Sequence, residues 1–340
     1  MSGAGAGRPL ALTLGEPGGI GPDIAIEAWL ARSAGDIPPF IFVGDAGVLA
    51  RRAKMLGRDV PTASTTADRA ADIFPNALPC LEGVPPVHGA PGAIDAADTA
   101  AVIRSIRDAA ILVRSGAAAA IVTNPIQKKA LNAAGFEFPG HTEFLGALAA
   151  ELFGVTAVPV MMLAGPDLKV VPVTIHIPLS EVPRALTTEL IVATGTIVAR
   201  DLEKRFGIAR PRIAVAGLNP HAGEEGMLGR EDAAIVRPAI EALVRAGVAA
   251  TGPLPADTMF HAEARRTYDA ALCMYHDQAL IPIKTLAFDD AVNVTLGLPF
   301  VRTSPDHGTA LSLAGTGKAR ATSLIAALKM AEALSRRAAG

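Results

Sequence analysis

Short runs of valine, isoleucine, leucine and alanine alternate along this chain with longer segments whose apolar residues recur at helical spacing. The pattern predicts buried strands at residues 10–14, 40–43 and 119–123, and helices at residues 23–32, 98–115 and 143–152. Strands that alternate with helices are typical of parallel βαβ units. Between residues 61 and 97, prolines and glycines interrupt every periodic pattern, which predicts mainly loop with short elements. We therefore expect an α/β fold.

The length of the chain predicts two domains. Its 340 residues exceed the roughly 250–300 residues at which a single hydrophobic core usually stops growing. A short helix is expected after Pro125, and the passage to a second unit is expected at residues 136–140. The last predicted helix, over residues 319–337, is rich in alanine and is expected to pack back on the first unit.

Composition and charge limit the partners and the compartment. A net charge of -2 gives no general reason to expect nucleic acid or a membrane surface as partner, so any anion would need a local site. Cys80 and Cys273 lie far apart without metal-type spacing, which favours a reducing compartment, and Cys273 is expected in the core. The N-terminal residues lack the apolar segment of a signal peptide, and no run approaches transmembrane length. We expect a cytoplasmic protein.

Three histidines come at the ends of three apolar runs. They are His176 after residues 170–175, His221 after residues 213–220 and His276 after residues 270–275. Strands of a parallel sheet place their carboxyl ends along one edge, where ligands bind, so these imidazoles could meet. A histidine at a strand end is more often a surface or hydrogen-bonded residue, but the recurrence favours a metal site. Three imidazoles leave positions open for water or substrate, as in a catalytic site.

Two loops could approach a ligand. Residues 15–22 are rich in glycine and join a strand to a helix, but they match neither the dinucleotide fingerprint nor a phosphate loop. A tight turn without a ligand is the alternative. His141 and Thr142 open a predicted helix, whose first N–H groups could bind an anion. The alternative there is a capping Thr142 beside a solvated His141.

Further polar residues follow in the second half of the chain. Lys284, Asn293 and Arg302 recur at intervals of nine and could bind a phosphorylated, carboxylated substrate, although single basic residues are usually solvated. Asp257 and Asp277 could each accept a proton or orient an imidazole. For Asp257, a capping role ahead of a helix over residues 258–266 is an alternative.

Six short motifs follow one another along the chain. They are Gly15-Glu16-Pro17-Gly18-Gly19-Ile20-Gly21-Pro22-Asp23, Thr123-Asn124-Pro125-Ile126, Gly140-His141-Thr142-Glu143-Phe144, Leu218-Asn219-Pro220-His221-Ala222-Gly223-Glu224, Pro253-Leu254-Pro255-Ala256-Asp257-Thr258 and Tyr275-His276-Asp277-Gln278. Each motif alone is weak, but the ordered set is specific and extends from about Leu10 to the last helix. The set resembles the 4-hydroxythreonine-4-phosphate dehydrogenase family of pyridoxal phosphate biosynthesis.

This resemblance implies a homodimeric enzyme of two α/β domains with a central cleft, similar to isocitrate and isopropylmalate dehydrogenases. We expect residues 1–135 and 305–340 to form the cofactor-side domain, and residues 136–304 to form the domain for metal, substrate and dimerisation. The resemblance also implies metal ligands that are shared across the dimer interface, namely His176, His221 and His276. The substrate contacts that it implies are His141, Thr142, Lys284, Asn293 and Arg302.

A second resemblance concerns the cofactor. Residues 307–317 are similar to the adenosine loop of isopropylmalate dehydrogenases, which implies cofactor contacts from His307, Gly308, Ser312 and Gly315. Ser312 replaces an aspartate that would bind the ribose hydroxyls and repel a 2'-phosphate. We therefore expect NAD and leave NADP open.

The implied reaction is the NAD(P)-dependent oxidation of 4-phosphohydroxy-L-threonine. The product, 2-amino-3-oxo-4-phosphooxybutanoate, then loses carbon dioxide to give 3-amino-2-oxopropyl phosphate. The metal could be zinc, magnesium or cobalt, and imidazole ligands favour zinc or cobalt. Candidate proton acceptors are Lys284, Asp257 and Asp277, which the sequence does not rank.

Two other hypotheses remain open at this point. A relative in the same family could oxidise 4-phospho-threonate or a cis-dihydrodiol carboxylate. A protein of another class, either a metal-dependent hydrolase or a phosphosugar-binding protein, could use the same three histidines.

Overall fold

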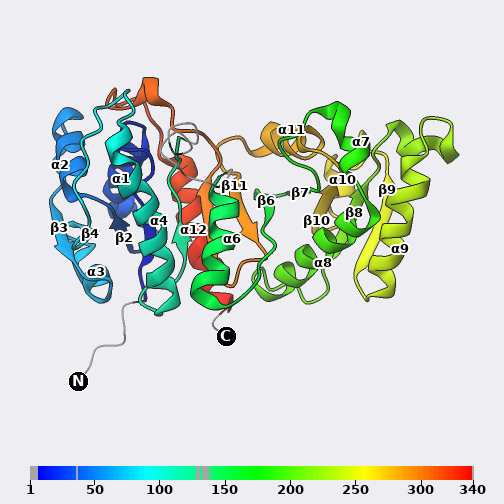
Figure 1. The fold of residues 1–340 in the computed structure, drawn as a ribbon, viewed down its shortest axis with the longest axis horizontal. Coiled ribbons are helices and arrows are strands. Elements are labelled where there is room, and N and C mark those ends of the chain that lie inside the picture. Colours follow the sequence, from blue (N-terminus) through cyan, green and yellow to red (C-terminus); the bar gives the residue numbers. More distant parts are fainter. Residues whose placement is uncertain (1–6, 36, 128–130, 132–137, 139, 339–340) are drawn as a thin grey trace. The chain divides into compact units, whose positions relative to one another are not determined.

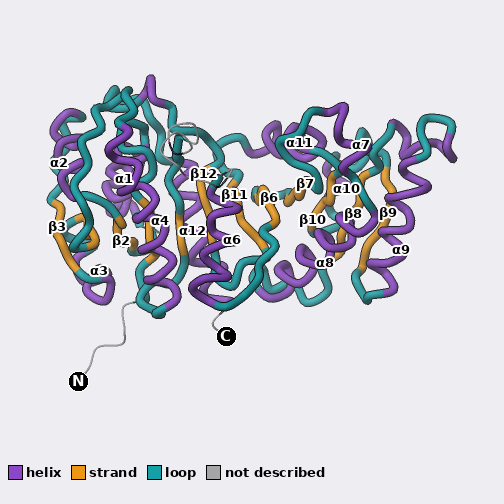
Figure 2. The backbone as a smooth tube through the Cα atoms, viewed as in Figure 1, coloured by secondary structure: helices purple, strands orange, loops and turns teal. Residues whose placement is uncertain are grey.

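The computed structural model describes residues 7–35, 37–127, 131, 138 and 140–338. The chain forms two compact units. The first contains residues up to Pro159 and Leu298–Arg336, and the second contains Val160–Gly297 with the last residues. Helices and strands alternate in both units, as Figures 1 and 2 show, so the predicted α/β class is confirmed.

The first unit is built on parallel strands in the order β3-β4-β2-β1-β5-β12. Their bounds are β1 Leu10–Thr13, β2 Phe40–Val43, β3 Thr62–Thr65, β4 Leu78–Leu81, β5 Ile121–Val122 and β12 Arg302–Pro305. The central strands β1 and β2 are buried along their whole length, as expected of near-continuous apolar runs in a sheet covered on both faces.

Helices connect these strands and pack against them. They are α1 Gly21–Leu30, α2 Ala46–Met55, α3 Ala67–Ile73, α4 Thr99–Arg114, α6 His141–Phe153 and α12 Thr322–Ala338, with short 3-10 turns at Ala31–Ala34, Ala96–Asp98 and Leu311–Leu313. Helix α4 packs on β1, and α1 packs on α2. The apolar face of α12 is buried, which confirms that the last helix returns to the first unit.

The second unit has strands in the order β11-β6-β7-β10-β8-β9. Their bounds are β6 Val160–Ala164, β7 Lys169–Pro172, β8 Arg212–Ala216, β9 Ala249–Leu254, β10 Ala270–Cys273 and β11 Val292–Leu296. Strands β7, β10, β8 and β9 are parallel neighbours. Strand β6 runs antiparallel to both β7 and β11, so the expectation of parallel units throughout was wrong here.

The second unit has its own helices and core. The helices are α7 Val182–Ala185, α8 Thr188–Lys204, α9 Arg237–Arg245, α10 Ala262–Arg265 and α11 His276–Ala287, with shorter turns at Leu179–Glu181, Pro220–Gly226 and Asp232–Val236. Leu163, Val170, Ala214 and Ile283 belong to one buried cluster. Cys273 belongs to it as well, which confirms its predicted place in the core.

The boundaries can be compared with the prediction. Residues 61–97 contain the short elements β3, α3 and β4 and are otherwise mainly loop, as expected. The first unit extends to Pro159 rather than residue 135, so α6 belongs to it. Most of the helix expected after Pro125, and of the passage at 136–140, lies outside the described residues. In the part of the chain that the structure describes, no single helix is long and apolar enough to cross a membrane.

Candidate metal and substrate site

The three candidate metal ligands follow three adjacent parallel strands. His176 comes after β7, His276 comes three residues after the end of β10 at the start of α11, and His221 comes after β8. Strand β10 lies between the other two. Pairing of Cys273 with Pro172 brings the ends of β10 and β7 level. The expected shared edge therefore exists, and its cause is the order β7-β10-β8, which the sequence alone does not reveal.

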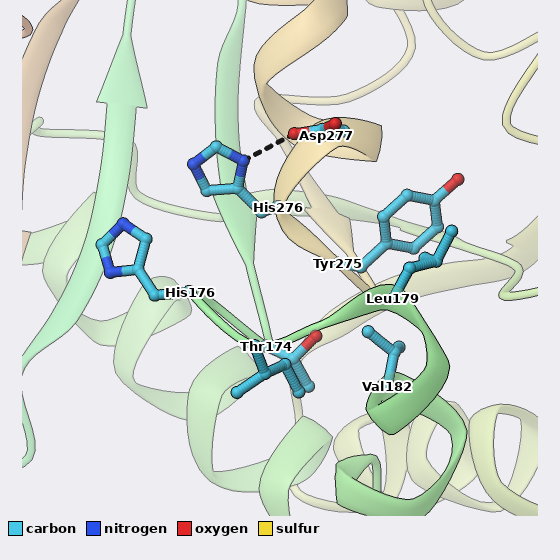
Figure 3. Close-up of a pocket in the computed structure, with 8 residues that line it drawn as sticks. Thr174, His176, Leu179, Val182, Tyr275, His276 and Asp277 are labelled. Carbon is cyan, nitrogen blue, oxygen red and sulfur yellow. Dashed lines mark hydrogen bonds and ion pairs between the residues drawn. The ribbon is translucent and has the colours of Figure 1, made fainter.

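The imidazoles of His176 and His276 lie close together. Their ring centres are 5.6 Å apart, and both rings point to the same side in Figure 3. Metal–nitrogen distances of about 2.0–2.1 Å place the ring centres of two imidazoles that share one ion roughly 5–6 Å apart. This pair therefore has a spacing that one divalent ion can bridge.

Asp277 orients the ring of His276. Its carboxylate Oδ1 lies 2.7 Å from His276 Nδ1, as the dashed line in Figure 3 marks. A carboxylate on Nδ1 favours the tautomer with a proton there and leaves Nε2 as the metal-binding atom. Of the two roles considered for Asp277, the geometry favours this orienting role over proton abstraction.

Both imidazoles line one pocket of the second unit. Its lining also includes Thr174, Ile177, Leu179, Val182, Tyr275 and Asp277. The pocket measures about 230 Å³, which is below the roughly 300–1,000 Å³ typical of sites for small organic ligands. It therefore has room for an ion and a few coordinating atoms, but not for a dinucleotide.

His221 lies on a left-handed turn. Residues 221–225 all have positive φ, with φ 50° at His221 and φ 53° at Ala222. Asp232 holds this turn, because its carboxylate accepts hydrogen bonds from the N–H groups of Leu218 at 2.7 Å and Asn219 at 3.1 Å. Among the described residues of one chain, no three His, Cys, Asp or Glu side chains form a group that could hold a metal. The three-histidine site stays a prediction.

His176 shares the strained backbone of His221. Its φ is also 50°, in the left-handed region that residues other than glycine rarely adopt. Such strain persists only where the surroundings impose it, and it clusters at functional sites. Two of the three predicted ligands thus share this conformation, which four other non-glycine residues of the described chain also adopt, namely Ala222, Glu224, Glu225 and Ala310.

The two remaining base candidates have different surroundings. Lys284 lies on α11, eight residues after His276, and is not among the residues that line the pocket. Its ammonium is 5.1 Å from the ring centre of Phe288. Asp257 is exposed and is not among the residues that line the pocket. It does not cap a helix either, because α10 begins at Ala262 and its N-cap is His261.

The predicted substrate contacts are divided between the units. His141 and Thr142 begin α6 in the first unit, with Gly140 at the N-cap, so Thr142 is not the cap. Asn293 lies half-buried on β11 of the second unit, as Lys284 does on α11.

Arg302 is the most buried of the predicted substrate contacts. It lies on β12 of the first unit with 4% of its surface exposed, and its Nε donates to Thr123 Oγ1 at 3.1 Å. Burial lowers the pKa of this guanidinium to about 10, so it remains charged at neutral pH.

The predicted cofactor loop is attached to helix α1. Gly315 has φ 71°, and its N–H donates to Asp23 Oδ1 at 2.7 Å. Asp23 forms a buried ion pair with Arg52, whose guanidinium also donates to the carbonyl of Gly19 at 2.9 Å. His307, Gly308 and Ser312 are exposed on the same loop. In the sequence, Asp23 has a place in the first motif but no assigned role, and no local pattern distinguishes Arg52 from an ordinary helix residue.

The glycine-rich loop 15–22 makes its close approaches to the chain itself. A side chain at Gly18 would lie 1.8 Å from the carbonyl oxygen of Ala93, and one at Gly19 would lie 2.8 Å from that of Thr309. These contacts favour the tight-turn interpretation. Glu16, in this loop, is buried and accepts a hydrogen bond from the N–H of Gly18 at 3.2 Å.

Glu16 predicts a pH dependence of stability. Burial, with smaller contributions from the charges of Asp98 and Asp95, raises its pKa above the ordinary 4.5. The folded state therefore binds the proton of Glu16 more tightly than the unfolded chain does. The stabilisation that this proton contributes is fully present below pH 4.5 and is lost as the pH rises through the raised pKa. We expect Glu16→Gln, which keeps the acceptor for Gly18, to remove this loss and to stabilise the protein at neutral pH. The thermal unfolding temperatures of both proteins, measured from mildly acidic to neutral pH, test this prediction. If stability falls as steeply with pH in the variant as in the wild-type protein, the prediction is contradicted.

Fold and site together define a class: a two-unit α/β protein with a paired-imidazole pocket at the carboxyl edge of a parallel sheet. Within this class, the family model described as pyridoxal phosphate biosynthetic protein PdxA matches residues 36–331. The chain belongs to the PdxA family. A 4-hydroxythreonine-4-phosphate dehydrogenase of Bradyrhizobium diazoefficiens is 58% identical over 96% of this chain and 96% of its own.

Solved structures agree with this assignment. A 4-hydroxythreonine-4-phosphate dehydrogenase from Klebsiella pneumoniae has a TM-score of 0.84 and 38% identity, covering 96% of this chain and 99% of its own. A terephthalate 1,2-cis-dihydrodiol dehydrogenase from Burkholderia xenovorans has a TM-score of 0.63 and 27% identity, with coverage of 96% and 97%. These likenesses confirm the predicted α/β fold of the isocitrate dehydrogenase-like type.

Proposed function

We propose that this protein oxidises 4-hydroxythreonine-4-phosphate at its secondary hydroxyl, with NAD or NADP as hydride acceptor. The oxidation removes the carbon-bound hydrogen as hydride and the hydroxyl hydrogen as a proton. The resulting 2-amino-3-oxo-4-phosphooxybutanoate loses carbon dioxide and gives 3-amino-2-oxopropyl phosphate. The observation that carries the proposal is the His176–His276 pair in a chain whose PdxA relatives carry this activity in their names.

The residues of the pocket fit a divalent metal. Two imidazoles lie at bridging distance, Asp277 directs His276 Nε2 outward, and the strained turns hold His176 and His221 in unusual backbone conformations. Nitrogen ligands of this kind suit zinc or cobalt, and magnesium less well. When bound, the ion lowers the pKa of the substrate hydroxyl and polarises the carbonyl that forms.

The chain's own residues would bind and orient the substrate. Lys284 and Arg302 supply positive charge for the phosphate and carboxylate, and Asn293 supplies an amide. His141 and Thr142 add donors at the first turn of α6. Lys284, which lies on α11 with His276, would take the hydroxyl proton.

The cofactor would bind along the loop that contains His307, Gly308, Ser312 and Gly315. The Gly315–Asp23 hydrogen bond supports this assignment, because it fixes the backbone of the loop against α1. Ser312, in place of a carboxylate, has no charge to repel a 2'-phosphate, so NAD is expected and NADP is tolerated.

A homodimer would complete the site. Within the described residues of a single chain, the metal-binding group of three is not assembled. The pocket of His176 and His276 is also bordered by an exposed apolar side chain, Leu179, with 68% of its surface accessible. A second copy on this face would bury Leu179 and could contribute the remaining imidazole, as the family resemblance implies.

One assay tests the function. We expect the purified protein to form NADH with 4-hydroxythreonine-4-phosphate and NAD, to lose this activity with a metal chelator, and to regain it with zinc or cobalt. The same measurement with NADP, with 4-phospho-threonate and with a cis-dihydrodiol carboxylate ranks cofactor and substrate. Activity on the unphosphorylated diol alone, or product without NADH, would overturn the proposal.

A further inference from the structure

The strand ends that bear His176, His221 and His276 are joined by a side chain without an assigned role. Gln278, on the first turn of α11, is 8% exposed, and both ends of its amide are bonded. Its Oε1 accepts from the N–H of Met274 at 2.7 Å, and its Nε2 donates to the carbonyl of Gly217 at 2.7 Å. One side chain thus links the end of β10 to the end of β8.

Gly217, whose carbonyl accepts the hydrogen bond from Gln278, also contacts the turn that contains His221. A side chain at Gly217 would lie 2.8 Å from the Cα of Ala222, so the backbones of Gly217 and the His221 turn touch. Gly217 is also fixed on its other side, since its N–H donates to the carbonyl of Leu254 at 2.8 Å. A displacement of the Gly217 carbonyl would therefore reach the residue next to His221.

Thr174 forms the third connection. Its Oγ1 donates to the carbonyl of Met274 at 2.7 Å, and Thr174 is 5% exposed. Met274 is thereby held by Gln278 through its N–H and by Thr174 through its carbonyl. Thr174 lies two residues before His176, and Met274 lies two residues before His276. The Oγ1 bond therefore adds to the backbone bond from the Thr174 N–H to the same carbonyl, at 3.3 Å, in joining the two loops that bear the imidazole pair.

We propose that Gln278, assisted by Thr174, is a positioning residue that fixes the three histidine-bearing loops of each chain relative to one another. The inference rests on the proposed function, because the geometry matters for metal binding. Buried polar networks of this kind specify one arrangement when every member is bonded, and removal of one member leaves its partners unsatisfied. Both Met274 N–H and the Gly217 carbonyl would lose their partner without the Gln278 amide.

The test uses Gln278→Met, which keeps the length of the side chain and removes both hydrogen bonds. We expect titration with Co²⁺, followed by the visible absorption of histidine-bound cobalt, to show about 10–100-fold weaker binding than in the wild-type protein, as for other groups that orient metal ligands indirectly. In the metal-free protein, NMR of the imidazoles is expected to show shifted resonances for His221 and His276, with His88 and His307 unchanged.

Two further variants separate positioning from folding. Thr194→Val removes a partly buried bond of Oγ1 to the Leu190 carbonyl in α8, away from the histidines, and should leave Co²⁺ binding unchanged. Thr174→Val should shift His176 and His276 but not His221. Unshifted imidazoles in Gln278→Met, or weaker Co²⁺ binding in Thr194→Val, would overturn the inference. If the wild-type protein binds no Co²⁺, the metal proposal fails, and the imidazole spectra still decide the role of Gln278.

Discussion

Replacing His276 by alanine is expected to lower kcat/KM for 4-hydroxythreonine-4-phosphate by roughly 10³-fold or more, since a catalytic metal is worth several kcal/mol to the transition state. The variant loses one of the two imidazoles that lie 5.6 Å apart, together with the ring that Asp277 orients. NADH formation at saturating cofactor measures the loss. Metal analysis of the same samples is expected to show less bound metal than in the wild-type protein.

The matched control for this prediction is His261→Ala. His261 is an exposed histidine of the same unit that caps α10 and does not line the pocket. Its replacement should leave kcat/KM and the metal content close to those of the wild-type protein. A folded His276→Ala variant with near-normal turnover would remove the imidazole pair from the mechanism.

The fold could be predicted where the apolar pattern was strong. Strands β1 and β2 are continuous buried runs, and α1 begins at a Gly-Pro pair, so local sequence and tertiary environment agree there. Strand β3 escaped prediction because it lies at the edge of its sheet, is mostly polar and is held by pairing with β4 alone. Its conformation depends on a partner strand rather than on its own residues.

The direction of β6 could not be predicted from its apolar pattern. An apolar run such as residues 160–164 has the same pattern in a parallel and an antiparallel strand. Here a short hairpin reverses the chain, with Gly165 N–H bonded to the Leu168 carbonyl at 2.8 Å. The Gly165-Pro166-Asp167 sequence is a turn signal that would have indicated this hairpin.

The candidate site could be predicted as residue types but not as an arrangement. Histidines after apolar runs pointed to one sheet edge, and the order β7-β10-β8 brings their strands side by side. The left-handed turn at His221 could not be foreseen, because the segment before it is held by hydrogen bonds that the carboxylate of Asp232 accepts, and Asp232 lies beyond the turn in the sequence. The role inferred for Gln278 likewise depends on contacts between three separate strands.

The buried ion pair between Asp23 and Arg52 in the first unit leads to a second prediction, which concerns the stability of the fold. Replacing Arg52 by methionine is expected to lower the free energy of unfolding by about 3–5 kcal/mol, because it leaves the carboxylate of Asp23 buried without its partner charge. Asp23 and Arg52 are 1% and 2% exposed, so water cannot compensate. The variant also loses the hydrogen bonds to the carbonyls of Gly19 at 2.9 Å and Pro17 at 3.0 Å. Urea unfolding measures the change.

Two further variants test whether burial of the ion pair causes this loss of stability. Arg58→Met breaks the Arg58–Glu27 pair, which joins the segment after α2 to α1 and is partly exposed. Its loss should cost no more than about 1 kcal/mol. The double variant Asp23→Asn with Arg52→Met should recover part of the stability, because the isolated charge is gone. Equal losses in the Arg52 and Arg58 variants would refute the role of burial. Since Asp23 also holds Gly315, Arg52→Met should weaken NAD binding in a fluorescence titration, whereas Arg58→Met should not.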